Sequence, residues 1–375
     1  MLPLYHGFGI FARMKRNCQH FTGFSSLTDS VIIIKSVCTI IRCGAAYKKG
    51  GKPVTRKTGS RRTAKRKKKN AGKWFICIFL ELVIILTLVV VIGWDYGVEA
   101  WMQELNEPAV RELDISGINS PNAILIQARS GKVLGEINGE ERIYPASLTK
   151  MMTAVVAMEH LKDLETGITL SQEMFAGLYE RDATQAGFQP GETVRAIDLL
   201  YGVMLPSGAE CCIALAEYIS GSEAAFVQLM NEKAKKLKMD QTHFCDSTGL
   251  HDPEHYSTVH DMAVLLKYCL KNETFREIIE SPWHSTGVTN IHPDGITFYS
   301  TMFKNLSDSA VTEGKILGGK TGFTEDAGYC LASFARVGKR EYILVTSGAP
   351  ESPMHIQDAV MVYHRLGEAL KRLKT

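Results

Sequence analysis

The sequence contains no Cys-x-x-Cys pair and no cysteine–histidine cluster with the spacing of a zinc finger. These absences argue against a structural zinc site, and we expect neither a metal nor another cofactor. The nine cysteines that are present lie mostly in apolar segments such as "ECCIALA" and "GYCLASF". Because free cysteine behaves as a small apolar residue, we expect buried free thiols rather than a disulfide framework.

Acidic residues are missing from one stretch, 56–73, in which lysines and arginines are concentrated. The whole chain carries a net charge of +3, so the rest of it is mildly acidic. Basic runs occur in nucleic-acid-binding proteins, but here no aromatic residue is interleaved with the basic ones. Contact with anionic membrane lipids is the simpler interpretation, and we expect no nucleic-acid partner.

Long hydrophobic runs are scarce, and one stands out at 74–94, "WFICIFLELVIILTLVVVIGW". It holds a single charge, Glu81, and is long enough to cross a bilayer core of about 30 Å as a helix. Because the basic stretch precedes it and acidic residues follow it, the positive-inside rule places the N-terminus in the cytoplasm. The apolar run is longer than that of a cleaved signal peptide, so we expect an uncleaved, single-pass anchor in the cell membrane.

Composition therefore divides the chain into four parts. The sequence predicts a largely disordered cytoplasmic basic tail at 1–73, a transmembrane helix at 74–94, a stalk at 95–113 and an extracytoplasmic folded domain at 114–375.

Within the last part, hydrophobic periodicity places strands at both ends and helices between them. Alternating apolar residues predict two strands in 122–138 and three consecutive strands in 315–349. Helical spacing occurs in 144–162, 193–221, 222–239, 258–272, 274–281 and 354–374. We expect an α/β fold of the α+β type: one mainly antiparallel sheet flanked by helices, with a helical subdomain inserted.

One predicted helix begins with "YPASLTKMMTA", which sets Ser147 three residues before Lys150. On a helix these two side chains share a face. A serine hydroxyl becomes a good nucleophile when a base removes its proton, and a lysine in an apolar setting can be that base. A surface helix with one exposed lysine is equally consistent with this sequence, so the Ser147–Lys150 pair alone does not establish an active site.

Two further places carry candidate chemistry. Lys320, Thr321 and Gly322 lie on a predicted strand, where a lysine and a hydroxyl can hold a carboxylate and a glycine lets a substrate backbone approach. Ser207 lies at the break between two predicted helices, in "MLPSGAE", where it is either a proton relay or simply a turn residue.

The order and spacing of these three motifs resemble the signature of the penicillin-interacting serine enzymes. The chain resembles the D-alanyl-D-alanine carboxypeptidases, the low-molecular-mass penicillin-binding proteins of serine peptidase family S11. The likeness runs from about Ile115 to the C-terminus and includes "YPASLTKMMTA", "LLYGVMLPSGAE", "FCDSTGLHDPEHYST" and "GKTGFTEDAGYCLASFA". It implies a fold of the β-lactamase and penicillin-binding transpeptidase type.

The resemblance also implies roles for the reacting groups. Ser147 would form an acyl-enzyme with the carbonyl between two D-alanines of a peptidoglycan stem peptide, and Lys150 would be its general base. Ser207 would relay a proton to the leaving nitrogen. β-Lactam antibiotics are the expected inhibitors.

Other residues would bind the substrate rather than react with it. The resemblance implies that Lys320 and Thr321 hold the terminal carboxylate. The backbone N–H groups of Ser147 and Phe323 would form the oxyanion hole.

The chain departs from the family at one position, because the usual Ser-x-Asn motif reads Ser207-Gly208-Ala209. A penicillin- or peptide-binding protein with reduced turnover is therefore the alternative to an active peptidase. A β-lactamase is less favoured, because no Glu-x-x-Leu-Asn segment lies between the first and third motifs. Glu210 follows directly, and either orients the site or faces solvent.

Three histidines, His251, His255 and His260, lie close together in "GLHDPEHYSTVH". Their spacing suits a metal only on a continuous helix, which Pro253 interrupts. We expect a loop of hydrogen-bonded histidines along one wall of the cleft, with His251 in the structural role.

Overall fold

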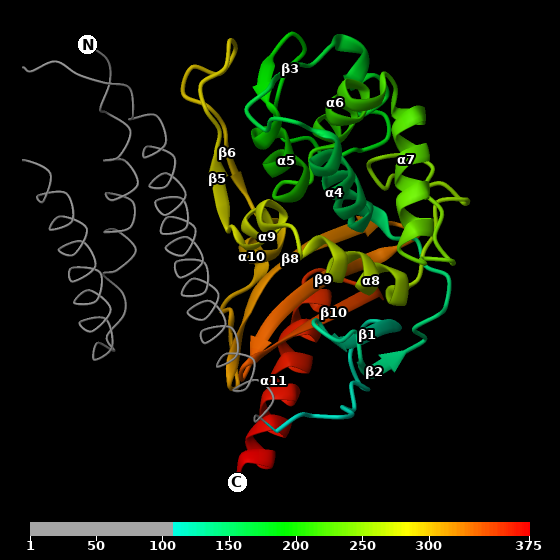
Figure 1. Cartoon of the computed structure of the whole chain (residues 1–375), viewed down its shortest axis with the longest axis vertical. Coiled ribbons are helices and arrows are strands. Elements are labelled where there is room, and N and C mark those ends of the chain that lie inside the picture. The colour runs from blue at the N-terminus through cyan, green and yellow to red at the C-terminus, as the bar shows by residue number, and fades with distance from the viewer. Residues whose placement is uncertain (1–107) are drawn as a thin grey trace, which may run out of the picture. The chain divides into compact units, whose positions relative to one another are not determined.

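Residues 108–375, which the computed structural model describes, form an antiparallel sheet with helices packed on both of its faces (Figure 1). The basic tail, the predicted span 74–94 and residues 95–107 of the predicted stalk lie outside the described residues. Within 108–375, every helix is too short or too polar to be a candidate membrane span.

The sheet has six strands in the order β2-β1-β10-β9-β8-β7. Their bounds are β1 (Asn122–Gln127), β2 (Val133–Ile137), β7 (Ala310–Val311), β8 (Gly314–Thr324), β9 (Gly328–Val337) and β10 (Arg340–Ala349). The first strand pairs with the last, with Leu125 opposite Leu344. The prediction of one sheet built from both ends of the domain is confirmed.

Alternation along the strands separates two hydrophobic cores. On β1, Ile124 and Ile126 belong to one core while Ala123 and Leu125 belong to the other. Successive side chains of a strand point to opposite faces, so a sheet that is apolar on both faces needs a cover on each. The strands therefore read as nearly continuous apolar runs.

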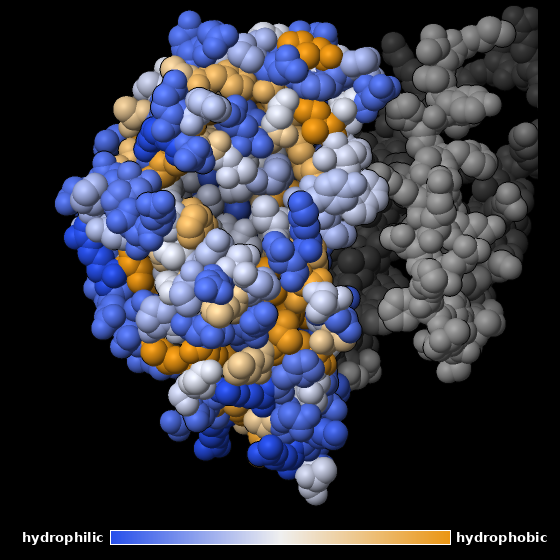
Figure 2. Space-filling view, turned by 180° about the vertical axis from the view of Figure 1, so that it is seen from behind, coloured by the Kyte–Doolittle hydropathy of each residue, from blue (hydrophilic) through white to orange (hydrophobic). Residues whose placement is uncertain are grey.

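One face is covered by α11 (Met354–Lys374) and the other by the helices from the middle of the chain (Figure 1). The latter are α4 (Lys150–His160), α5 (Ala196–Met204), α6 (Ala209–Ser220), α7 (Glu223–Lys236), α8 (Val259–Cys269) and α9 (Glu273–Glu280). On the surface seen in Figure 2, hydrophilic residues predominate and hydrophobic ones form small scattered groups. Each predicted helical segment contains a helix, but residues 193–195, predicted as the start of one, form a short strand instead.

Side-chain caps mark where three of these helices begin. Ser222 accepts a hydrogen bond from the N–H of Ala225 at α7, and Thr258 and Asn272 do the same at α8 and α9. Such caps satisfy backbone donors that have no partner inside the helix. Gly221, with φ of +76°, ends α6 in the left-handed conformation that favours glycine.

Several short elements escaped the sequence analysis. They are two hairpins, β3 (Gly167–Thr169) with β4 (Thr193–Arg195) and β5 (Trp283–Ser285) with β6 (Thr297–Tyr299), the 3-10 helices η2 (Ala146–Thr149) and η3 (Gln172–Phe175), and α10 (Thr301–Asn305). Strands of three residues are too short for an alternation of period two to stand out. The cysteines of the described part are all free, and four of the five are buried.

His355, on the first turn of α11, gives the fold a pH dependence. It is 3% exposed and stacks on Tyr329, with ring centroids 5.3 Å apart. Burial lowers its pKa to about 4, against the opposing charge of Asp358. In the unfolded chain its pKa returns to 6.5. Between these values only the unfolded state binds the proton, so the fold loses stability as the pH falls.

We therefore expect His355 to cost the fold about 3 kcal/mol of unfolding free energy between pH 6.5 and pH 4. The measurement is the difference in unfolding free energy between the natural chain and His355→Phe, followed over that pH range. Phenylalanine keeps the stacked ring and cannot titrate. A difference that stays constant with pH would contradict the assignment.

Candidate active site

Ser147 lies on the 3-10 turn η2, directly before α4 begins at Lys150. The sequence placed both residues on one α-helix, whereas the structure divides them between a tighter turn and the helix. The Lys150 Nζ still lies 3.1 Å from Ser147 Oγ. The local spacing therefore brings a candidate nucleophile within reach of a candidate base.

Lys150 is held away from water. It is 3% exposed, and its Nζ donates a hydrogen bond of 2.6 Å to the carbonyl of Thr248. Leu148, Met151 and Met152 are fully buried in the core around this helix. The reading of an exposed surface lysine is wrong.

The Thr248 carbonyl is fixed by a tight turn. Asp246 Oδ1 accepts hydrogen bonds from the N–H groups of Thr248 and Gly249, at 2.7 and 2.6 Å. Gly249 has φ of +80°, and a Cβ there would lie 1.9 Å from the carbonyl oxygen of Ala146. Only glycine lets this turn pack against the segment that carries Ser147.

His255 fastens the same loop to the serine turn. It is buried, its Nε2 lies 2.8 Å from Thr149 Oγ1, and the N–H of Cys245 donates to its Nδ1 at 3.2 Å. Since Nδ1 accepts, the ring proton lies on Nε2 and is donated to Thr149. Burial lowers the pKa of His255, against the opposing effect of Asp246, which favours this neutral form.

The prediction of hydrogen-bonded loop histidines holds for His255, but it is wrong for His260, which lies on α8, and the buried structural position belongs to His255 and not to His251. His251 is about a third exposed, and its Nδ1 lies 3.3 Å from Asp326 while its ring meets the edge of Tyr144. Within 108–375, no three histidine, cysteine, aspartate or glutamate side chains are grouped so as to hold a metal ion.

Lys320 on β8 contacts Ser207, which lies between α5 and α6. The Lys320 Nζ donates a hydrogen bond of 3.0 Å to Ser207 Oγ, and Lys320 is fully buried. Burial, and secondly the charge of Lys150, holds the pKa of the Lys320 ammonium well below its ordinary range. A buried cation with a depressed pKa gains from an anionic ligand, which would stabilise its charged form.

Ser207 adopts a conformation that a serine rarely takes. Its φ is +74°, at the break between α5 and α6, where Gly208 N–H donates to the carbonyl of Gly202. Strained backbone of this kind persists where the surrounding structure imposes it, and is common at functional sites. Its hydroxyl is bonded to Lys320, so the structure links the second and third motifs directly.

The third motif lies against the first along β8. A Cβ on Gly322 would lie 3.1 Å from the backbone nitrogen of Ser147 and 3.2 Å from the carbonyl of Pro145. The sequence analysis expected Gly322 to let a substrate backbone approach, and the structure shows that this glycine also allows the close approach of β8 to η2. The close approach sets the backbone of the next residue, Phe323, beside the Ser147 segment.

Thr321 and Phe323, which flank Gly322 on β8, have contacts of their own. Thr321 Oγ1 lies 2.6 Å from Thr301 Oγ1 at the start of α10. The Phe323 ring is half exposed and stacks on Tyr329, with centroids 4.3 Å apart.

Glu210 has a role that the sequence left open. It is fully buried, and its Oε1 accepts hydrogen bonds from the N–H groups of Ala186 and Gly187, at 2.6 and 3.0 Å. Burial raises the pKa of this carboxyl, against the opposing effect of those hydrogen bonds. Glu210 therefore holds the loop that wraps around Gly208 and does not face solvent. The sequence feature that could have indicated this buried role is an acidic residue in an otherwise apolar segment.

Comparison with known proteins gives the same family by three routes. A family described as D-alanyl-D-alanine carboxypeptidase, Peptidase S11, matches residues 108–351. The D-alanyl-D-alanine carboxypeptidase DacF of Bacillus subtilis is 34% identical over 228 residues, which are 61% of this chain and 57% of that protein. DacC of Escherichia coli is 32% identical over 249 residues, or 64% and 59% of the two chains.

Among solved structures, the DD-transpeptidase of Streptomyces K15 superposes with a TM-score of 0.60 at 25% identity. The match covers 70% of this chain and 99% of that one. The chain spans less than three fifths of the length of the two curated relatives.

Proposed function

The chain belongs to the D-alanyl-D-alanine carboxypeptidase family, peptidase family S11, and we propose that it removes the terminal D-alanine from peptidoglycan stem peptides. The observation that carries this proposal is the distance of 3.1 Å between Lys150 Nζ and Ser147 Oγ, in a site with a buried second lysine. A serine, an adjacent base and a cationic pocket are what acyl transfer from a peptide with a free carboxylate requires.

The reaction begins with Ser147. Lys150, as general base, accepts its hydroxyl proton as Oγ bonds to the carbonyl carbon between the two D-alanines. The N–H groups of Ser147 and Phe323 receive the negative charge that develops on the carbonyl oxygen. When the C–N bond breaks, the proton passes from Lys150 to the leaving nitrogen, with Ser207 as relay. Water then hydrolyses the acyl-enzyme and restores Ser147.

Lys320 and Thr321 recognise the terminal carboxylate. The buried Lys320 ammonium has no carboxylate partner within 108–375, so a substrate anion would supply the missing counter-charge. β-Lactam antibiotics, which carry a carboxylate near a strained amide, would use the same pocket and acylate Ser147.

The proposed setting is the outer face of the cell membrane. An apolar segment at 74–94, after a basic stretch, supports a single-pass anchor with the N-terminus in the cytoplasm. Through this anchor the protein would have membrane lipids as a partner. The test is extraction of the full chain from membranes with alkaline carbonate, which an anchored chain resists.

The peptidase activity is tested by D-alanine release. The full chain is given an acyl-L-Lys-D-Ala-D-Ala peptide, and released D-alanine is measured beside labelling by a fluorescent penicillin. We expect both. Folded protein that gives neither would refute the proposal, and labelling without release would favour a binding protein.

The binding-protein alternative rests on Ala209, and Ala209→Asn tests it. Ala209 is buried at the first residue of α6, two residues from Ser207. An asparagine there supplies one polar contact to the substrate amide, so we expect D-alanine release to rise by about tenfold. Ala209→Leu, of similar size without the amide, should show no gain. An unchanged rate in Ala209→Asn would mean that the natural site is adapted to alanine.

A further inference from the structure

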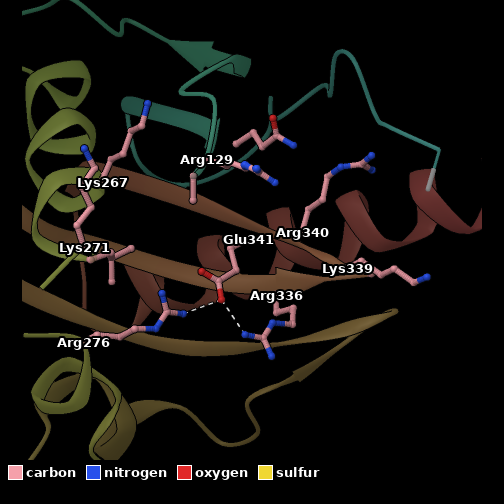
Figure 3. Close-up of a pocket in the computed structure, with 12 residues that line it drawn as sticks. Arg129, Lys267, Lys271, Arg276, Arg336, Lys339, Arg340 and Glu341 are labelled. Atoms are coloured by element: carbon pink, nitrogen blue, oxygen red, sulfur yellow. Dashed lines mark hydrogen bonds and ion pairs between the residues drawn. The ribbon is translucent and has the colours of Figure 1, made fainter. Parts of the chain in front are cut away.

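A basic cavity lies beside the turn between β9 and β10 (Figure 3), at the end of β9 opposite to the one that pairs with Gly322. Its volume is about 700 Å³, within the usual range for ligand sites. The turn after β1, the end of α8, α9 and the β9–β10 turn line it. Seven of its lining residues are lysines or arginines and one, Glu341, is acidic.

Glu341 organises part of this charge. Its Oε1 accepts hydrogen bonds from Arg276 at 2.6 Å and from Arg336 at 2.8 Å, and Figure 3 shows both guanidinium groups directed at it. Arg276 is also paired with Glu280, at 2.9 Å. Burial raises the pKa of Glu341, but the hydrogen bonds from Arg276 and Arg336 lower it overall, so this carboxylate stays ionised. Two guanidinium groups are thereby fixed side by side.

The two lysines on α8 leave an excess of positive charge. Lys267 and Lys271 have no carboxylate partner in the part of the chain that the structure describes. Lys271 lies 5.7 Å from the ring of Tyr268, and Lys267 reaches over Gly131, where a Cβ would lie 2.6 Å from its Nζ. Arginine forks and lysine point charges in one cavity suit phosphate groups.

The position of the cavity relative to the predicted membrane anchor indicates which phosphate groups it would bind. Arg340 donates a hydrogen bond of 2.8 Å to the carbonyl of Pro108, so the chain enters the domain at the rim of the cavity. Only residues 95–107 separate Pro108 from the predicted anchor, a reach of at most ~45 Å. On β9, Cys330 pairs with Gly322 at the active site, whereas Val337 pairs with Arg340 beside the cavity. The two ends are about 20 Å apart along the strand.

We propose that this cavity binds the phosphate headgroups of anionic lipids at the membrane surface and holds the domain with Ser147 turned away from the bilayer. The proposal rests on the anchor at 74–94, which would keep the cavity within reach of headgroups. Each basic residue near an anionic membrane surface adds to the electrostatic attraction, so several together would orient a tethered domain.

The test is lysine modification of the full chain in nanodiscs. One set contains phosphatidylcholine alone and the other also contains phosphatidylglycerol. A water-soluble acylating reagent is added, and modification of Lys267 and Lys271 is followed by mass spectrometry. We expect their modification to slow by at least threefold in the anionic discs and to recover in high salt, because salt screens the contact. Lys162, exposed in the loop after α4, is the internal control and should be unaffected.

Two double variants distinguish lipid binding at the cavity from general electrostatic attraction of the domain to the membrane. Lys267→Gln with Lys271→Gln should weaken the protection of Lys339 in anionic discs, while Lys235→Gln with Lys236→Gln on α7 should leave it unchanged. Both double variants should keep D-alanine release, since these residues lie outside the site.

Two results would overturn the proposal. One is equal modification in both kinds of disc. The other is protection in neutral discs by a soluble poly(glycerol phosphate), which would assign the cavity to a polymer instead of a lipid. Retention of the chain in the discs reports the anchor separately. If the chain is not retained in the discs, the same modification experiment is done with vesicles of the same two lipid compositions. The same two results would overturn the proposal there.

Discussion

Replacing Ser147 with alanine is expected to lower D-alanine release by about 10⁴-fold or more, because no other group can form the acyl-enzyme. Labelling by a fluorescent penicillin should disappear with it, since both reactions begin with the same bond to Oγ. The measurement is the initial rate of D-alanine release from an acyl-L-Lys-D-Ala-D-Ala peptide, together with the penicillin-labelled band.

The matched control is Ser130→Ala, which removes an exposed hydroxyl from the turn between β1 and β2. Its rate should equal that of the natural chain. Release that persists in Ser147→Ala at more than a hundredth of the natural rate would place the nucleophile elsewhere.

Replacing Lys150 with methionine is expected to lower both penicillin acylation and D-alanine release by about 10³-fold, because the serine loses its proton acceptor. Methionine is close in shape and suits the buried setting, so the loss should not come from unfolding. The thermal midpoint should stay within a few degrees of that of the natural chain.

Lys162→Met, in the exposed loop after α4, controls for the loss of one positive charge. The acylation rate is measured over a range of pH, since a general base leaves a pH profile that a structural lysine does not. An unaltered rate and profile in Lys150→Met would remove Lys150 from the mechanism and leave the 3.1 Å contact as packing.

The parts of this fold that were predictable are those with local signals. Periodicity over ten or more residues is enough to identify α7 or β9, and the break at Pro206 separates α5 from α6. Ser147 and Lys150 are also local, since a single turn joins them. The short β5–β6 hairpin has no such signal, because its fold depends on the elements it packs against.

Contacts between distant segments were not predictable from spacing alone. Ser207 and Lys320 are 113 residues apart, and only the resemblance to a family brought them together before the structure did. The hydrogen bond from His255 to Thr149 joins residues 106 positions apart in the sequence. No local sequence feature distinguishes His255 from the nearby His251. Burial decides between them, and burial is a property of the finished fold.

The pairing of β1 with β10 has a consequence for how the protein is made. The chain emerges from the ribosome N-terminus first, so β1 and β2 leave long before β10 exists to pair with them. A chain that stops after α9 would contain Ser147, Lys150 and Ser207 but lack β8, which carries Lys320 and Phe323. Contacts between such distant segments also form slowly. The proposed active site would therefore be complete only after the last strands are released, and a partly synthesised chain would not carry the proposed activity.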